Sequence, residues 1–152
     1  MHHLFFTHLV GCVASVCLMG SAVAQTPGSP PRDASLAAPT DLSCPQASNC
    51  VNSLGGSDLL PLRYAGAPAQ GMALLLTTLA SYPEARVVSS GPLRLQAIFT
   101  TPLGFRDLVD FVVVEQTNQI AYRSRSLLGI YDFGKNRARM TDFSQRFAAD
   151  SR

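Results

Sequence analysis

The sequence predicts an α+β fold: a two-layer sandwich in which a four-stranded antiparallel meander sheet carries an N-terminal and a C-terminal helix packed on one face. Two segments have apolar residues at helical spacing, 68–81 and 136–149, and they enclose four short strand-like segments, 85–90, 93–100, 108–115 and 120–126. Short connections between strands favour antiparallel neighbours. The 152-residue chain has room for one such domain, which we place at residues 42–149.

Residues 1–24 have the pattern of a signal peptide. From Leu9 to Ala24 the chain carries no charge, and Ala22-Val23-Ala24 supplies the small-x-small pattern after which signal peptidases cut. We therefore expect a periplasmic or secreted protein that starts at Gln25. Two alternatives stay open: lipidation at Cys12, and retention of the leader as an anchor, although its apolar run is shorter than the ~20 residues of a bilayer span.

Residues 25–41 are rich in Pro, Ala, Ser and Thr and lack a run of large apolar residues, so we expect a flexible linker. All three histidines precede Gln25, and this excludes Ser-His-Asp and Cys-His catalysis from a cleaved chain. Twelve Lys and Arg against ten Asp and Glu give a net charge of +2, too small to indicate a nucleic-acid partner. We expect no cofactor, and contact with a membrane only through an uncleaved leader.

Cys44 and Cys50 enclose a short loop at the start of the domain. In an oxidising compartment the default for such a pair is a disulfide. A redox-active pair is the alternative, but the spacing is not C-x-x-C and no basic residue lies nearby in sequence to activate a thiol. Two thiolates without a histidine would leave a tetrahedral zinc half-coordinated, so no metal site is predicted.

The first helix is predicted by the helical spacing of Met72, Leu75, Leu76 and Leu79, with Pro68 suited to its first position. Strand 85–90 ends at Gly91-Pro92. Strand 93–100 alternates, with one apolar face made by Leu93, Leu95, Ala97 and Phe99. The last helix, 136–149, is predicted to start with Asn136 as its N-cap, to bury Met140, Phe143 and Phe147, and to turn Arg139, Asp142 and Arg146 outward.

Segments 108–115 and 120–126 form a hairpin around Thr117-Asn118. A two-residue turn there sets Asp110 opposite Arg125 and Val112 opposite Arg123, on one face of the sheet. The other face, with Val109, Phe111, Val113, Tyr122 and Ser124, is more apolar, so it is predicted to carry the helices. Asp110 and Arg125 would then form a surface cross-strand ion pair.

Residues 123–139, RSRSLLGIYDFGKNRAR, are the densest polar stretch of the chain. Together with CPQASNCVNS at 44–53, LPLRY at 60–64 and GFRDLVDF at 104–111, they resemble the exported domain-of-unknown-function family 1499, over about residues 44–147. Leu108, Leu127 and Ile130-Tyr131 depart from the family's usual residues, and Arg125 carries a charge two positions before Leu127. The resemblance implies a fold and export, and no activity.

The stretch 123–139 is the candidate site. A loop that enters a helix N-terminus offers free N–H groups, and arginines add charge-assisted bonds, so the segment predicts an anion site. Its candidate residues are Arg123, Arg125, Asp132, Lys135, Asn136, Arg137 and Arg139. The alternative is that Asp107, Asp110 and Asp132 neutralise these arginines internally and fix the corner between strand and helix.

The sequence therefore favours an exported, non-catalytic domain that binds a small anion or a cell-envelope component through residues 123–139. Two other classes stay open. One is a hydrolase that works without histidine, through Asp132 and Asp107. The other is a purely structural interaction module.

Overall fold

The computed structural model describes residues 41–55 and 58–151. The predicted leader, Cys12 and most of the predicted linker lie outside these residues. The described chain is an α+β domain, as predicted. Its elements are β1 (Cys50–Asn52), β2 (Leu62–Arg63), α1 (Pro68–Ala80), β3 (Ala85–Ser90), β4 (Arg94–Thr100), β5 (Arg106–Val114), β6 (Gln119–Ser126) and α2 (Lys135–Asp150).

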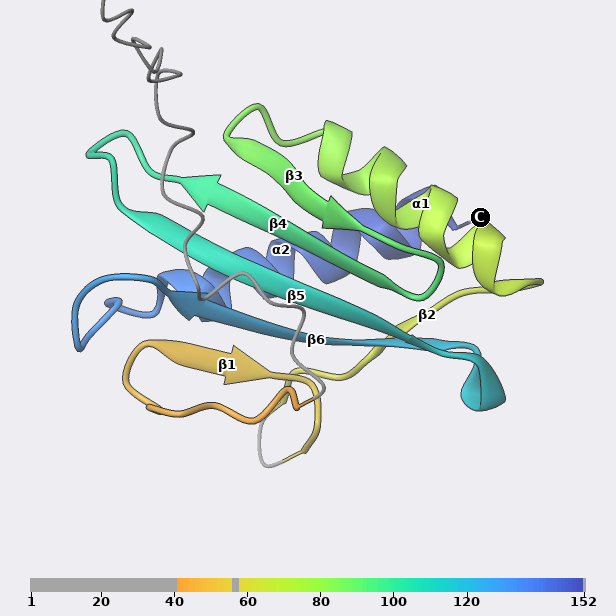
Figure 1. Ribbon diagram of the computed structural model, residues 1–152, viewed down its shortest axis with the longest axis horizontal. Coiled ribbons are helices and arrows are strands. Elements are labelled where there is room, and N and C mark those ends of the chain that lie inside the picture. The colour runs from red at the N-terminus through yellow and green to blue at the C-terminus, as the bar shows by residue number, and fades with distance from the viewer. Residues whose placement is uncertain (1–40, 56–57, 152) are drawn as a thin grey trace, which may run out of the picture. The chain divides into compact units, whose positions relative to one another are not determined.

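The strands form one antiparallel sheet in the order β1-β6-β5-β4-β3, with β2 also paired to β6 (Figure 1). Strands β3 to β6 are the predicted meander, so the four-strand count was incomplete. β1 and β2 were missed because they are only three and two residues long, too short for an alternating pattern. Both pair antiparallel with β6, at opposite ends of that strand.

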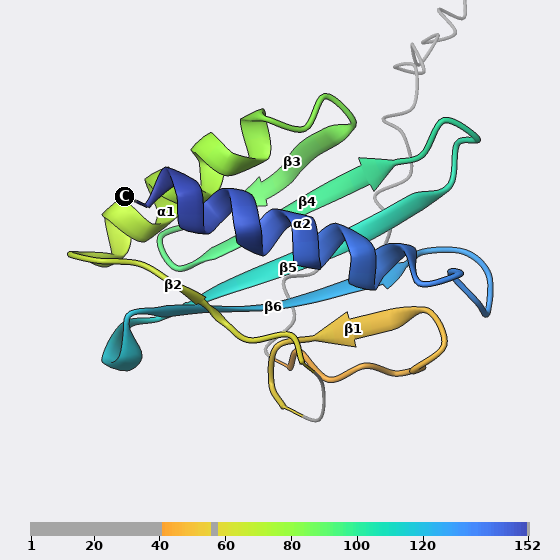
Figure 2. The ribbon, with the colours of Figure 1, turned by 180° about the vertical axis from the view of Figure 1, so that it is seen from behind.

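Both helices cover the same face of the sheet, behind it in Figure 1 and in front of it in Figure 2. The core between the two layers combines Leu75 and Leu79 of α1 with Phe143 and Phe147 of α2. The predicted stripe of α2 and the predicted apolar face of the hairpin are both confirmed. Among the described residues, no helix combines the length and apolar character that a bilayer span requires.

Gly71 lies inside α1, where glycine normally lowers helix stability. A Cβ atom at this position would lie 2.8 Å from the ring of Tyr64, which is itself buried. The segment that follows β2 therefore packs directly against the helix backbone. Close packing explains a residue that the helical pattern alone does not.

The β5–β6 hairpin has a different register from the predicted one. Asp110 pairs with Arg123, and Leu108 pairs with Arg125. The connection is longer than two residues, because a 3₁₀ turn over Glu115–Thr117 is followed by Asn118 in the left-handed region, with φ 51°. The shift is by two residues, so every side chain keeps its predicted face.

A disulfide joins Cys44 to Cys50, as predicted. It closes the loop that leads into β1, and β1 pairs Cys50 with Arg125 and Asn52 with Arg123. The disulfide loop therefore lies against the same strand that carries the first candidate arginines.

Candidate functional site

Helix α2 begins differently from the prediction. Asn136 was expected to be the N-cap, but the helix starts at Lys135 and its N-cap is Gly134, in a left-handed conformation with φ 76°. Asn136 lies inside the first turn and is completely buried. The reason is that its side chain lies beneath the helix, where its hydrogen bonds join three segments of the chain.

The Asn136 amide is the hub of that bridge. Its Nδ2 donates to the Asn49 carbonyl, to the Ser126 hydroxyl and to the Asp132 carboxylate, at 3.1, 3.2 and 2.7 Å. Its Oδ1 accepts from the Ser124 hydroxyl at 2.6 Å. Every polar atom of this buried side chain is therefore satisfied, as a buried amide requires.

Asp132 supplies the anion at the N-terminus of α2. Its Oδ1 accepts from the backbone N–H of Gly134 at 2.9 Å, and its Oδ2 accepts from the backbone N–H of Asn136 at 2.8 Å. A carboxylate at this position satisfies helix N–H groups and interacts favourably with the helix dipole. The N–H groups at the start of α2, which the sequence predicted to bind an external anion, thus bind the Asp132 carboxylate of the same chain.

Arg139 was predicted to face outward, and this is wrong. Its side chain is 11% exposed, and its Nη2 donates to Asp107 at 2.6 Å. Its Nη1 donates to Oδ1 of Asn136 at 3.0 Å, and the guanidinium lies 4.9 Å from the centre of the Phe99 ring. A charged partner on the helix-facing side of β5 draws Arg139 into the layer between sheet and helix.

Arg123 lies on the opposite face of the sheet. Its Nε and Nη2 donate to Oδ2 of Asp110 at 3.1 and 2.8 Å, and its Nη1 donates to the Ser43 carbonyl at 2.9 Å. Gln96 donates to the other carboxylate oxygen of Asp110 at 2.7 Å. The side chains of Arg123 and Asp110 are 8% and 2% exposed, so this is a buried ion pair and not the surface pair of Asp110 with Arg125 that the predicted register implied.

Arg125 pairs in register with Leu108 and is partly buried on the same face as Arg123. Burial, followed by the neighbouring charge of Arg123, lowers the pKa of its guanidinium. Arginine remains protonated in spite of such a shift. Arg125 thus adds positive potential to the face that holds the Asp110–Arg123 pair.

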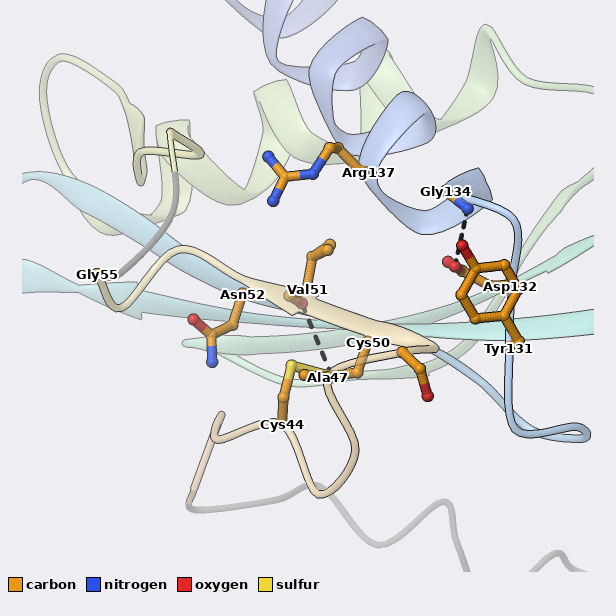
Figure 3. A pocket seen from close by; sticks show the side chains of 11 residues that line it. Cys44, Ala47, Cys50, Val51, Asn52, Gly55, Tyr131, Asp132, Gly134 and Arg137 are labelled. Atoms are coloured by element: carbon orange, nitrogen blue, oxygen red, sulfur yellow. Dashed lines mark hydrogen bonds between the residues drawn. A yellow bond between two sulfur atoms is a disulfide. The ribbon is translucent and has the colours of Figure 1, made fainter.

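Arg137 has a different environment. It projects from the first turn of α2 over β1, and Tyr131, Asp132 and Gly134 lie on the other side of the same hollow (Figure 3). We call this hollow the β1 cavity. It has a volume of about 430 Å³ and is lined by Cys44, Ala47, Ser48, Cys50, Val51, Asn52, Gly55, Tyr131, Asp132, Gly134 and Arg137.

The partner of Arg137 is Asp58, and both side chains are accessible, at 46% and 82% exposure. The hydrogen bond from Arg137 lowers the pKa of the Asp58 carboxyl, which keeps the pair charged. An exposed pair of this kind contributes little to stability, because solvent screens both charges. Among the arginines of the candidate stretch, a ligand in the cavity would break the weakest ion pair by binding to Arg137.

Lys135 is exposed and lines a second hollow of about 470 Å³, together with Arg139, Tyr82, Glu84 and Asp142. The acidic side chains there offset its basic ones. The seven candidate residues therefore lie in separate places: Arg123 and Arg125 on one sheet face, Asn136 buried under α2, and the others around two hollows.

No sequence pattern pointed to Ser48 and Asn52, which line the β1 cavity, or to Asp58, which pairs with Arg137. These three residues come from a segment far from residues 123–139. A signal did exist for Ser124, because a serine that alternates with core residues on the apolar side of a strand needs a polar partner. Within residues 41–55 and 58–151, no group of three or more His, Cys, Asp or Glu side chains could hold a metal ion.

The fold and this site define a class: a two-layer α+β domain with a disulfide-closed edge, in which two buried ion pairs and a buried asparagine fasten β5 and β6 to their surroundings. The sequence model of the family described as Protein of unknown function (DUF1499) matches residues 42–147. The chain belongs to this family, as its sequence motifs indicated. A search of curated proteins found none that matches the chain.

Proposed function

We propose that this protein is an exported, non-catalytic domain that binds an anionic ligand, carrying a carboxylate or phosphate group, through Arg137 in the β1 cavity. The observation that carries the proposal is the accessibility of Arg137 at the cavity, where its ion-pair partner among residues 41–55 and 58–151 is the exposed carboxylate of Asp58. A guanidinium can hold a carboxylate or phosphate through two parallel hydrogen bonds. A volume of about 430 Å³ falls within the range of small-molecule sites.

Asp132, the acid among the lining residues, already accepts hydrogen bonds from the start of α2. That internal use of Asp132 reduces its repulsion of a bound anion. A ligand that displaces Asp58 from Arg137 gives up only a solvent-exposed ion pair.

The state of the carboxylates supports binding over hydrolysis. Asp107, one of the two acids considered for a hydrolase, has a side chain that is 5% exposed. One oxygen of Asp107 accepts from Arg139 and the other from Ser126, each at 2.6 Å. Both oxygens of Asp132 accept from the start of α2. A general acid or base needs a carboxylate that can reach a substrate proton.

The Cys44–Cys50 disulfide supports the export part of the proposal, because disulfides persist in oxidising compartments. Cell fractionation, with the mass of the recovered chain, tests it. A mass that starts at Gln25 in a periplasmic or secreted fraction is expected. A full-length chain in a reducing compartment would contradict the proposal.

A thermal-shift series tests ligand binding. The full chain is titrated at low salt with inorganic phosphate, citrate and acidic glycans, next to Arg137→Gln and the matched control Arg63→Gln. Arg63 is exposed on β2, so both variants lose the same charge. A ligand at about 100 times its dissociation constant stabilises a protein by about 2.7 kcal/mol.

We expect one of these anions to raise the melting temperature of the wild type and of Arg63→Gln, and not that of Arg137→Gln. The proposal fails if no anion stabilises the wild type, or if Arg137→Gln keeps the full shift. Retention in Arg137→Gln would assign the anion to another basic group. Capture of an envelope protein without any anion effect would instead support the interaction module.

A further inference from the structure

Two loops at one end of the sheet expose six large apolar side chains, which we call the loop-tip patch. Their exposed fractions reach 84% for Leu103 and Phe133. One loop joins β4 to β5 and the other joins β6 to α2, and both leave the sheet at the same end, on the left in Figure 1 and on the right in Figure 2. The patch consists of Leu103, Phe105, Leu128, Ile130, Tyr131 and Phe133.

The two loops leave the sheet next to each other. Asp107 pairs with Ser126 in the sheet, and the N–H of Leu127 donates to the carbonyl of Arg106 at 3.0 Å. Each chain then runs directly into its loop. Exposed large apolar side chains that gather at one end of a domain are typical of a surface that has a partner.

Hydrogen bonds hold both loops in shape. In the first loop, Thr101 donates to the Phe105 carbonyl and Gly104 donates to the Thr101 carbonyl, each at 2.8 Å. In the second, the Ile130 carbonyl accepts from the side chains of Gln46 and Ser48. The backbone that carries these apolar side chains is thus held by hydrogen bonds, and their exposure is not a consequence of an irregular, unsupported loop.

Phe133 has φ 54°, in the left-handed region that residues other than glycine, asparagine and aspartate rarely adopt. Its ring stands edge-on to that of Tyr131, with 5.0 Å between the ring centres. The backbone therefore adopts an unfavourable conformation while an aromatic pair remains in solvent. An unfavourable backbone that persists in a structure points to a functional constraint.

Two exposed cations lie beside the patch, since Arg106 and Lys135 follow the two loops directly. Of the neighbouring acids, Asp107 is paired with Arg139 and Asp132 accepts from the backbone of α2, whereas Glu84 and Asp142 line the second hollow together with Lys135. Apolar side chains with neighbouring cations match a bilayer surface that carries anionic headgroups.

We propose that the loop-tip patch docks on an anionic lipid bilayer, with its apolar side chains entering the boundary between headgroups and acyl chains, and with Arg106 and Lys135 near the phosphates. Aromatic and aliphatic side chains on protruding turns suit this shallow boundary. This departs from the expectation that only an uncleaved leader contacts a membrane. The two surfaces share Tyr131, but anion binding in the β1 cavity depends on Arg137, whereas membrane docking depends on the other apolar side chains of the patch and on Arg106 and Lys135.

Fluorescence tests the proposal, because the chain contains no tryptophan. Phe133→Trp places a single probe in the patch of the full chain, and Leu60→Trp places a control probe at a side chain that is 74% exposed. Leu60 precedes β2, which pairs with β6 at the end opposite to the patch. Vesicles are made of phosphatidylcholine alone or with phosphatidylglycerol, with and without a lipid that carries a quencher in its acyl chain.

On the anionic vesicles we expect emission from Phe133→Trp to shift to the blue and to be quenched, and emission from Leu60→Trp to stay unchanged. Two cations near the surface predict binding at least about tenfold weaker to neutral vesicles. Arg106→Gln with Lys135→Gln should reduce the difference between the two lipids, whereas Arg63→Gln should not. Circular dichroism establishes that each variant is folded.

The site-specific probe keeps the result decisive even when the leader binds vesicles by itself. Vesicle-bound Phe133→Trp with unchanged emission would overturn the proposal, and so would the absence of binding to anionic vesicles. A blue shift that depends on protein concentration and needs no lipid would assign the patch to contact between two copies of this chain instead.

Discussion

The buried pair of Asp110 and Arg123 gives the strongest prediction about stability. In Arg123→Met, Oδ2 of Asp110 loses its hydrogen bonds at 3.1 and 2.8 Å, and the carboxylate keeps the bond from Gln96. The Ser43 carbonyl also loses its donor. Because the Asp110 side chain is only 2% exposed, water does not replace these contacts. Removing one member of a buried pair costs about 3–5 kcal/mol, and we expect a loss in this range.

A double-mutant cycle separates the interaction from the loss of side-chain packing. The variants are Arg123→Met, Asp110→Asn and the combination of both. When neither charge remains, no buried charge is left unpaired, so the double variant should be more stable than the two single losses predict, by about 2–3 kcal/mol. The matched control is the exposed pair of Arg137 and Asp58, for which a cycle should give a much smaller coupling, because solvent screens both charges.

Urea denaturation measures all these free energies, provided that the slope against urea stays constant across the series. A loss below about 1 kcal/mol in Arg123→Met, with no coupling to Asp110, would refute the reasoning. The Arg123 side chain would then be in contact with solvent, and it would return as a candidate for ligand binding.

Three further predictions concern the rest of the domain. Loss of the Cys44–Cys50 disulfide should lower the free energy of unfolding by about 2–3 kcal/mol, and equal melting temperatures before and after reduction would contradict a stabilising role. Asn136→Ala should cost about 2–4 kcal/mol in urea, because several buried groups lose their partners, and a loss below about 1 would mean that water replaces the amide. Burial and the hydrogen bond to Asp142 raise the pKa of Tyr82 above its ordinary value of 10.0, so above pH 10 the folded state keeps a proton that the unfolded state releases. The stability that this hydroxyl contributes should therefore be complete below about pH 10 and should fall above it. Tyr82→Phe should lessen this fall, measured as melting temperature against pH.

The sequence was sufficient for the features that periodicity controls. Apolar spacing gave both helices, and alternation gave strands β3 to β6 and the sheet face that packs against the helices. It was sufficient for the disulfide as well, because Cys44 and Cys50 are the pair expected to be oxidised after export. These signals are local, and local patterns are what a single sequence carries.

Register and edges depend on contacts that no local pattern records. The left-handed Asn118 lengthens the hairpin connection and moves Arg123 opposite Asp110. Strand β1 forms by pairing with the edge of β6, and its three residues are too few to show an alternating apolar pattern in the sequence. The N-cap of α2 is Gly134 and not Asn136, because Asn136 is held beneath the helix by partners on β6 and on the disulfide loop.

Charge density along the chain therefore differs from charge density in space. Alternation along β6 sends Arg123 to one face of the sheet and Ser124 to the other, and each face supplies its own acid, Asp110 or Asp107. The positive charges that remain accessible near the start of α2 are those of Arg137 and Lys135. One lies over the β1 cavity and the other lies beside the loop-tip patch, so Arg137→Gln and Phe133→Trp test two surfaces that one stretch of sequence made look like a single site.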